Sequence, residues 1–262
     1  MAKEPSKKEL QAAEGELSSL REGHGDEAEE TLDGMTRLAK LYYSAGRYQE
    51  ALRLQERVVE IRERDYGAED PKTLADLYVL APILGGSGQM DAAREVGERV
   101  LSTSVRLFGA DDHRSVNARR NLEITCHRLG DFARLETLGE EMLASVERRS
   151  GPESEATLVP LNNLANTRRI LGKTEGAREL DERRVDIAWR VYGPGREETL
   201  EAELFLAGDL SLLGRTGESL DLLRKATVQA KGSLDPANRV RLQLQETLAQ
   251  IESMLAESGD SD

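Results

Sequence analysis

Aromatic residues, cysteine and histidine are scarce in this sequence of 262 residues. Aromatic residues make up 4% of the chain, and it contains one cysteine and three histidines. Strand-rich proteins carry more Val, Ile, Tyr and Phe, so a composition dominated by Leu, Ala, Glu and Arg favours helices. The single cysteine, Cys126, excludes an intramolecular disulfide and a zinc site built from several cysteines. It fits a reducing compartment, and we expect a cytoplasmic protein.

The lack of a long uncharged stretch and the small number of basic residues limit the partners of the chain. No uncharged stretch approaches the ~20 residues that are needed to cross a bilayer. Acidic side chains outnumber basic ones by 49 to 36, which gives a net charge of −13. A protein with this charge repels phosphate backbones and anionic membrane surfaces. The sequence therefore predicts no nucleic-acid and no membrane partner. Its preference for Arg over Lys is typical of GC-rich bacterial genomes.

The few residues that could carry chemistry are poorly placed for it. Nucleophilic catalysis needs a base next to an activated hydroxyl or thiol. His24 and His113 fall between expected helices, and His127 follows Cys126 directly, so the two side chains point about 100° apart on a helix. The run Asp111-Asp112-His113 lacks the spacing of known metal motifs. The sequence predicts no enzyme, no cofactor and no metal site.

The dominant pattern is an internal period of 42 residues. It predicts a helical repeat, because leucines at this spacing suit a buried face, glycines suit sharp turns, and hydroxyl residues suit helix N-termini as caps. The three registers are Leu38, Leu80, Leu122, Leu164, Leu206 and Leu248; Gly46, Gly88, Gly130, Gly172 and Gly214; and Thr31, Thr73, Ser115, Thr157 and Thr199.

Each period reads as a helical hairpin. In the first one, a helix is expected over residues 31–44, a turn over 45–47 and a second helix over 48–65. Apolar residues in both helices follow the three-and-four spacing of one stripe. A single hairpin leaves that stripe in water, whereas stacked hairpins bury it. The expected fold is therefore an all-α solenoid of antiparallel helix pairs.

The hairpin resembles a known repeat. Leu38-Ala39, Tyr42, Gly46 and Ala51 match the tetratricopeptide signature, and Leu161-Asn-Asn-Leu-Ala165 resembles the 42-residue repeats of kinesin light chains and related bacterial arrays. The resemblance covers about residues 31–256 and implies a right-handed superhelix. The sequence departs from the signature at Glu123, Cys126, Leu135, Arg168, Ser219 and Asp235. Cys126 stands at the aromatic position, where a buried packing role is expected.

The repeat register divides the chain into five parts. We expect disorder over residues 1–5, a capping helix and linker over 6–30, five repeats over 31–240, a capping helix over 241–256 and a disordered acidic tail over 257–262. Ser6 and Glu9 form the pattern of a capping box. Pro82, followed by glycines at 85, 86 and 88, lies in the middle of an expected helix, which should kink or end early. It is either a hinge or a tolerated lesion.

The resemblance also selects a binding surface. In tetratricopeptide superhelices the concave wall is lined by residues of the first helix of each repeat, and in kinesin light chains similar asparagines face cargo peptides, which the resemblance implies for Asn121 and Asn163. Amides can hydrogen-bond a peptide backbone and arginines can pair with its carboxylates. The positions are Arg37, Lys40 and Tyr43 in the first repeat, Tyr78 in the second, Asn117, Arg120, Asn121 and Arg128 in the third, Asn162, Asn163, Asn166 and Arg169 in the fourth, and Phe205 in the fifth.

These positions predict a basic, amide-rich groove that binds an acidic or mixed acidic and apolar peptide. The favoured function is a scaffold or adaptor for a partner protein. The alternative is a regulatory or sensor subunit of a bacterial signalling or transcription system. A third hypothesis, an enzyme, is disfavoured by the scarcity of catalytic groups. The polar groove residues could also be a solvated surface without a ligand, and self-association stays open beside a monomer.

Overall fold

The chain is mainly helical over the part that the computed structural model describes, residues 4–259, and this part contains no strand. The chain divides into two compact units, Met1–Asp131 and Phe132–Asp262. The disorder expected at residues 1–3 and 260–262 lies outside the described residues.

Each unit is a series of helical hairpins. The first unit contains α1 (Lys7–His24), α2 (Glu29–Ser44), α3 (Tyr48–Tyr66), α4 (Pro71–Gly86), α5 (Met90–Phe108) and α6 (His113–Leu129). The second contains α7 (Phe132–Ser150), the short 3₁₀ helix η1 (Glu155–Thr157), α8 (Leu158–Ile170), α9 (Thr174–Tyr192), α10 (Glu197–Leu212), α11 (Thr216–Ser233) and α12 (Arg239–Gly259).

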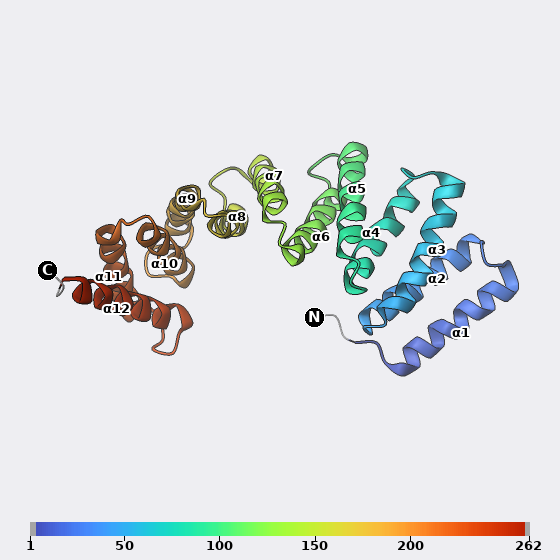
Figure 1. The fold of residues 1–262 in the computed structure, drawn as a ribbon, viewed down its shortest axis with the longest axis horizontal. Coiled ribbons are helices and arrows are strands. Elements are labelled where there is room, and N and C mark those ends of the chain that lie inside the picture. The colour runs from blue at the N-terminus through green and yellow to red at the C-terminus, as the bar shows by residue number, and fades with distance from the viewer. Residues whose placement is uncertain (1–3, 260–262) are drawn as a thin grey trace. The chain divides into compact units, whose positions relative to one another are not determined.

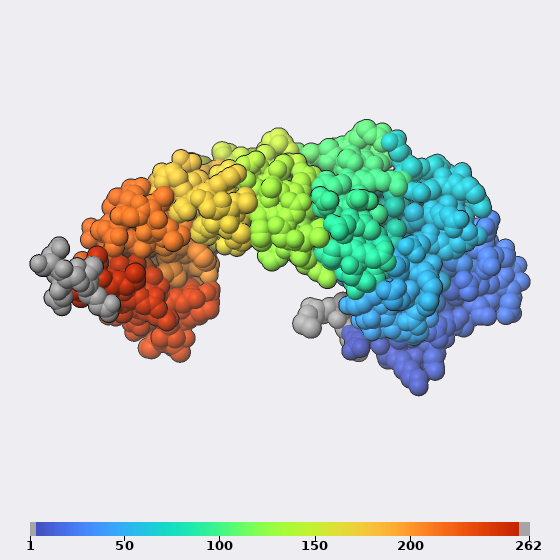
Figure 2. Space-filling model, in the orientation of Figure 1, coloured from blue at the N-terminus to red at the C-terminus, as the bar shows by residue number. Residues whose placement is uncertain are grey.

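Successive helices pack against one another within each unit (Figure 1). The first helices of neighbouring repeats also meet, α2 with α4, α4 with α6, and α10 with α12. In the space-filling view the helices of each unit form a continuously packed body (Figure 2). The all-α arrangement of consecutively packed helix pairs confirms the predicted fold class.

The leucine and glycine registers have the roles that the period predicts. Leu38, Leu80, Leu122, Leu164 and Leu206 are all buried, and Leu248 packs against the core of the second unit. The five turn glycines adopt positive φ angles, between 72° and 90°. L-residues with a side chain rarely adopt this conformation, so glycine at the turn is a backbone requirement. Cys126 is buried, as expected for a packing residue.

The prediction that hydroxyl residues cap the helices is wrong. Thr31 and Thr199 lie inside α2 and α10, because each helix begins two residues earlier than expected. Each buried Oγ1 donates instead to a glycine carbonyl of the preceding connector, to Gly25 at 2.8 Å and to Gly193 at 2.9 Å. A capping side chain is present at α4, where the Asp70 carboxylate accepts a backbone N–H of the first turn at 2.8 Å. The two threonines therefore hydrogen-bond the connector to the helix that follows it.

Pro82 does not end its helix early. It lies inside α4, which continues to Gly86. Ala81 and Ile83 on either side are buried, and their packing holds the helix in place across the missing hydrogen bond. Gly86 is needed where it is, because a Cβ there would lie 2.6 Å from the ring of Tyr48. The first two glycines after Pro82 thus belong to the last helical turn.

The first and last helices, α1 and α12, both begin with a side-chain cap. Ser6 Oγ accepts the Glu9 N–H at 3.2 Å and the Glu9 carboxylate accepts the Ser6 N–H at 2.7 Å, which confirms the capping box of α1. Asn238 caps α12, accepting the Val240 N–H at 2.9 Å. The helix α12 runs to Gly259, three residues beyond the expected end of the capping helix at residue 256.

Candidate functional site

The first unit carries eight of the residues that the sequence places on the binding surface, all on the first helices of repeats. Most of them are exposed, and two, Tyr78 and Asn121, are half-buried. They are Arg37, Lys40 and Tyr43 on α2, Tyr78 on α4, and Asn117, Arg120, Asn121 and Arg128 on α6.

One cavity brings three of these residues together. Lys40, Tyr78 and Asn117 line a cavity of about 340 Å³ in the first unit. Its wall also includes Phe108 at the end of α5 and Arg114 at the start of α6, and the guanidinium carbon of Arg114 lies 3.3 Å from the centre of the Phe108 ring. The cavity is therefore apolar and aromatic with cationic groups at its edge. It can hold an apolar side chain next to a carboxylate.

The search of the sequence missed Phe108 and Arg114. It considered only the first helix of each repeat from the capping position onward, whereas Phe108 ends a second helix and Arg114 lies in the first turn of α6. The signal that could have found them is the position of Phe108 directly before the connector glycine, Gly109.

Other predicted residues of the first unit are already engaged within the protein. Arg37 pairs with Glu16 at 2.6 Å. Tyr43 packs edge-on to Tyr48 with the ring centres 5.6 Å apart. Arg128 donates to the Gly85 carbonyl at 3.2 Å. In contrast, the exposed Lys40 and Arg120 side chains make no hydrogen bond or ion pair with the residues that the structure describes.

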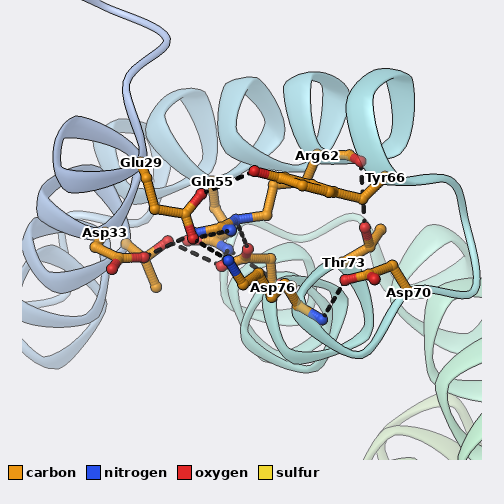
Figure 3. A network of polar contacts seen from close by, with 10 residues as sticks. Glu29, Asp33, Gln55, Arg62, Tyr66, Asp70, Thr73 and Asp76 are labelled. Carbon is orange, nitrogen blue, oxygen red and sulfur yellow. Dashed lines mark hydrogen bonds and ion pairs between the residues drawn. The ribbon is translucent and has the colours of Figure 1, made fainter.

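A polar network joins α2, α3 and α4 beside this surface (Figure 3). Its centre is Arg62, which is 3% exposed and pairs with Glu29 at 2.9 Å, Asp33 at 2.7 Å and Asp76 at 2.7 Å. Gln55 donates to the Asp76 carboxylate at 3.2 Å. Burial raises the pKa of Asp76 above its usual value. Because all of these side chains point at one another, the network fixes how the first repeat packs on the second.

The second unit contains a network of the same kind between α8, α9 and α10, and it includes two predicted binding residues. Arg169 pairs with Asp181 and, at 2.6 Å, with Asp209, and both carboxylates are fully buried. Arg184 donates to the Asn162 side chain at 2.8 Å and pairs with Asp181 at 3.5 Å. In the structure Arg169 and Asn162 therefore point inward. There the buried carboxylates compete with a ligand for the Arg169 guanidinium group.

Phe205 lies over this network on α10 and is 38% exposed. The guanidinium carbons of Arg169 and Arg184 lie 5.2 and 5.3 Å from the centre of its ring. Cations near a ring face are attracted to it. The aromatic side chain on the surface is therefore positioned by the two buried ion pairs beneath it.

The outer side of α8 carries the remaining predicted residues. Asn163 and Asn166 are exposed. Between and beside them the helix also exposes Val159, at 67%, and Ile170, at 49%. The sequence search missed both apolar residues because it selected polar side chains. Their spacing from the asparagines, in steps of three and four residues, was the available signal.

Asp181 gives the second network a dependence on pH. Burial raises its pKa to about 6, against the nearby Arg169 and Arg184 guanidinium groups, which lower it. A carboxyl whose pKa is higher in the folded than in the unfolded protein stabilises the fold fully below its unfolded pKa of about 3.9, and this stabilisation is lost as the pH rises through the folded pKa.

We therefore expect the stability of the unaltered protein, relative to an Asp181→Asn variant, to fall between about pH 4 and 6 and then to level off. Urea unfolding of both proteins at several pH values measures the difference, and the variant cancels the contributions of all other titrating groups. A difference that stays constant, or that grows with pH, would contradict this assignment.

Comparisons with known proteins identify the repeat. A family profile described as tetratricopeptide repeat matches residues 27–104 and 157–231, which is more than half of the chain. The chain belongs to the tetratricopeptide repeat family. Comparison with curated proteins gives no match.

Several solved structures have folds similar to this one. A putative kinesin light chain of Podosopora anserina, with nearly identical tetratricopeptide-like repeats, is 25% identical with a TM-score of 0.62, over 78% of this chain and 97% of that one. BtubC (BKLC) from P. vanneervenii is 19% identical with a TM-score of 0.57, over 88% of this chain and 94% of that one. The structure of Naa15/Naa10 bound to HypK-THB is 19% identical with a TM-score of 0.56, over 97% of this chain and 32% of that one.

The tetratricopeptide assignment supports a general role as a protein-interaction scaffold, which is the typical, non-catalytic use of this repeat. Among residues 4–259, no group of His, Cys, Asp and Glu side chains is arranged to hold a metal ion. None of the helices in this range has both the length and the apolar character that a membrane span requires.

Proposed function

We propose that this tetratricopeptide protein is a scaffold that binds an extended segment of a partner protein on the exposed sides of the first helices of its repeats. The observation that carries the proposal is the cavity lined by Lys40, Tyr78 and Asn117, beside side chains without internal partners. A free ammonium group at the edge of an apolar cavity favours a ligand that combines carboxylates with apolar side chains.

The two units offer different side chains to such a segment. In the first unit Lys40 and Arg120 supply free positive charge, and Asn117 supplies an amide. In the second unit Asn163 and Asn166 supply amides, which can donate to and accept from a peptide backbone. The proposal assigns no catalytic role to the chain. The buried thiol of Cys126 fits the reducing cytoplasm of a bacterium.

Changing one polar residue on each surface tests the proposal. We expect the double variant Asn163→Ala with Arg120→Glu to weaken binding of a partner by about tenfold or more, because one change removes a backbone-binding amide and the other repels carboxylates. The probes are two fluorescein-labelled peptide pools, one that alternates acidic and apolar residues and one that is uncharged, and the measurement is fluorescence anisotropy. Both residues are outside the core, so the melting temperature should stay close to that of the unaltered protein.

A matched control changes charge elsewhere. Arg149→Glu alters the net charge by the same amount as Arg120→Glu at an exposed position at the end of α7, a second helix of its repeat. Binding that survives the double variant, or that the control weakens equally, would overturn the surface assignment. Co-purification from cells then separates a scaffold from a regulatory subunit, since the latter should bring down an ATPase or a DNA-binding protein.

A further inference from the structure

The second unit exposes a row of uncharged side chains on α8, which we call the uncharged stripe. It consists of Val159, Asn163, Asn166 and Ile170. Steps of four, three and four residues place all four on one side of the helix. Val159 and Ile170 at its ends are the more exposed apolar residues of this helix, and the two amides lie between them. About a third of this chain is charged, so an exposed helix face without charge is unusual in it.

The arginines next to the stripe do not make it basic. Arg168 pairs with two glutamates of α7, Glu136 at 3.2 Å and Glu140 at 2.8 Å. Arg169 is held by the buried carboxylates of Asp181 and Asp209. Both guanidinium groups are therefore neutralised within the unit, and an approaching carboxylate would have to compete with partners already in place.

The first unit differs at the corresponding positions. One period earlier, α6 carries Asn117, Asn121, Ile124 and Arg128, and beside them lies Arg120 without an internal partner. The first unit thus offers positive charge at its surface. On α8 of the second unit, in contrast, Arg168 and Arg169 are both paired with carboxylates of their own unit.

Resting on the proposed function, we infer that the uncharged stripe is a separate docking surface for a peptide segment with apolar, uncharged side chains, while acidic segments bind on the first unit. The amides of Asn163 and Asn166 hydrogen-bond the backbone of the segment, and Val159 and Ile170 cover its apolar side chains. An acidic segment gains no ion pair there and loses the hydration of its carboxylates.

The dimensions of the stripe set the length of the segment. Eleven helical steps of about 1.5 Å separate Val159 from Ile170, a distance that about five extended residues span. Binding without ion pairs also predicts a weak dependence on salt, since only interactions between charges are screened.

The test uses the full chain and two fluorescein-labelled pools of peptides of about ten residues, long enough to cover the stripe. One pool contains only Leu, Ile, Phe, Ser and Asn, and the other has Asp or Glu at every second position. We expect Val159→Glu with Ile170→Glu to weaken binding of the uncharged pool by about tenfold or more and to leave the acidic pool unchanged. Fluorescence anisotropy gives both dissociation constants.

Two further variants complete the design. Val191→Glu with Val228→Glu adds the same charge at exposed valines of α9 and α11. This variant should change the dissociation constant of neither pool. Asn163→Asp with Asn166→Asp adds two charges to the stripe without changing side-chain size, so it should repeat the loss even if the glutamate variant folds poorly.

The outcomes separate the inference from the proposed function. If the uncharged pool binds and its dissociation constant is unmoved by both stripe variants, the inference is overturned while the scaffold function stands. The same holds if the stripe variants weaken both pools equally. If neither pool binds the unaltered protein, the inference and the proposed function both fail.

Discussion

Replacing Arg169 by alanine is expected to lower the free energy of unfolding by about 3–5 kcal/mol near pH 7.5, the usual cost of removing one partner of a buried ion pair. The reason is that Asp181 and Asp209 are both fully buried and both rely on this guanidinium group. Without it, Arg184 is left 3.5 Å from Asp181 as the remaining cation of the network. Urea denaturation followed by circular dichroism measures the change.

The same variant should become less harmful in acid. Because burial raises the pKa of Asp181 to about 6, lowering the pH toward 5 protonates that carboxyl and removes the charge that Arg169 compensates. The loss of stability on Arg169→Ala should therefore shrink between pH 7.5 and 5. If Arg169 contacted only a ligand, its replacement would change neither the stability of the isolated protein nor the pH dependence of that stability. An unchanged stability would therefore indicate that Arg169 belongs to the binding surface.

Arg149→Ala is the matched control for this experiment. It removes an exposed arginine of the same unit, where substitutions usually change stability by less than about 0.5 kcal/mol. A loss as large as that of Arg169→Ala would show that the unit responds to its net charge rather than to the buried pair. Replacing Arg169, Asp181 and Asp209 together by Met, Leu and Leu should restore much of the stability, because apolar groups of similar size need no compensation.

Arg169 also shows where sequence reasoning reached its limit. The 42-residue period placed the leucines in the core and the glycines in the turns, because both depend on a backbone geometry that repeats. It placed Arg169 on the first helix of its repeat as well. It could not show that Asp181, twelve residues on, and Asp209, forty residues on, would turn this side chain inward. These partners are specific to one repeat interface and are not repeated every 42 residues.

The wrong cap at Thr31 and the wrong early helix end at Pro82 have the same origin. A hydroxyl near the start of a helix suits a cap, and a proline in a helix suits a break, when only the local backbone is considered. In the structure the buried Thr31 hydroxyl reaches the connector glycine Gly25, and buried neighbours hold the helix together at Pro82. Tertiary packing overrides local preference at both positions. Val159 and Ile170 show the converse, since they are apolar residues that the structure leaves exposed.

The helix register of the second unit can be tested by Leu164→Ala. We expect it to lower the free energy of unfolding by about 2–5 kcal/mol, since it empties a fully packed site. Leu164 is buried with Leu143, Leu161 and Ile187. It also packs closely on α7, where a Cβ added to Gly139 would lie 3.2 Å from its Cδ1. Gly139 leaves room for the leucine, and it has no side chain of its own to fill the cavity left by alanine.

Val159→Ala is the control on the same helix. Val159 is exposed, and removing its methyl groups should change stability by less than about 0.5 kcal/mol. Thermal and urea unfolding of the two variants therefore compare the inner and outer sides of α8 directly. If both variants unfold like the unaltered protein, α8 is rotated relative to its assigned register, and the uncharged stripe that depends on this register is lost with it. A large loss for Leu164→Ala alone fixes which side of α8 faces the core.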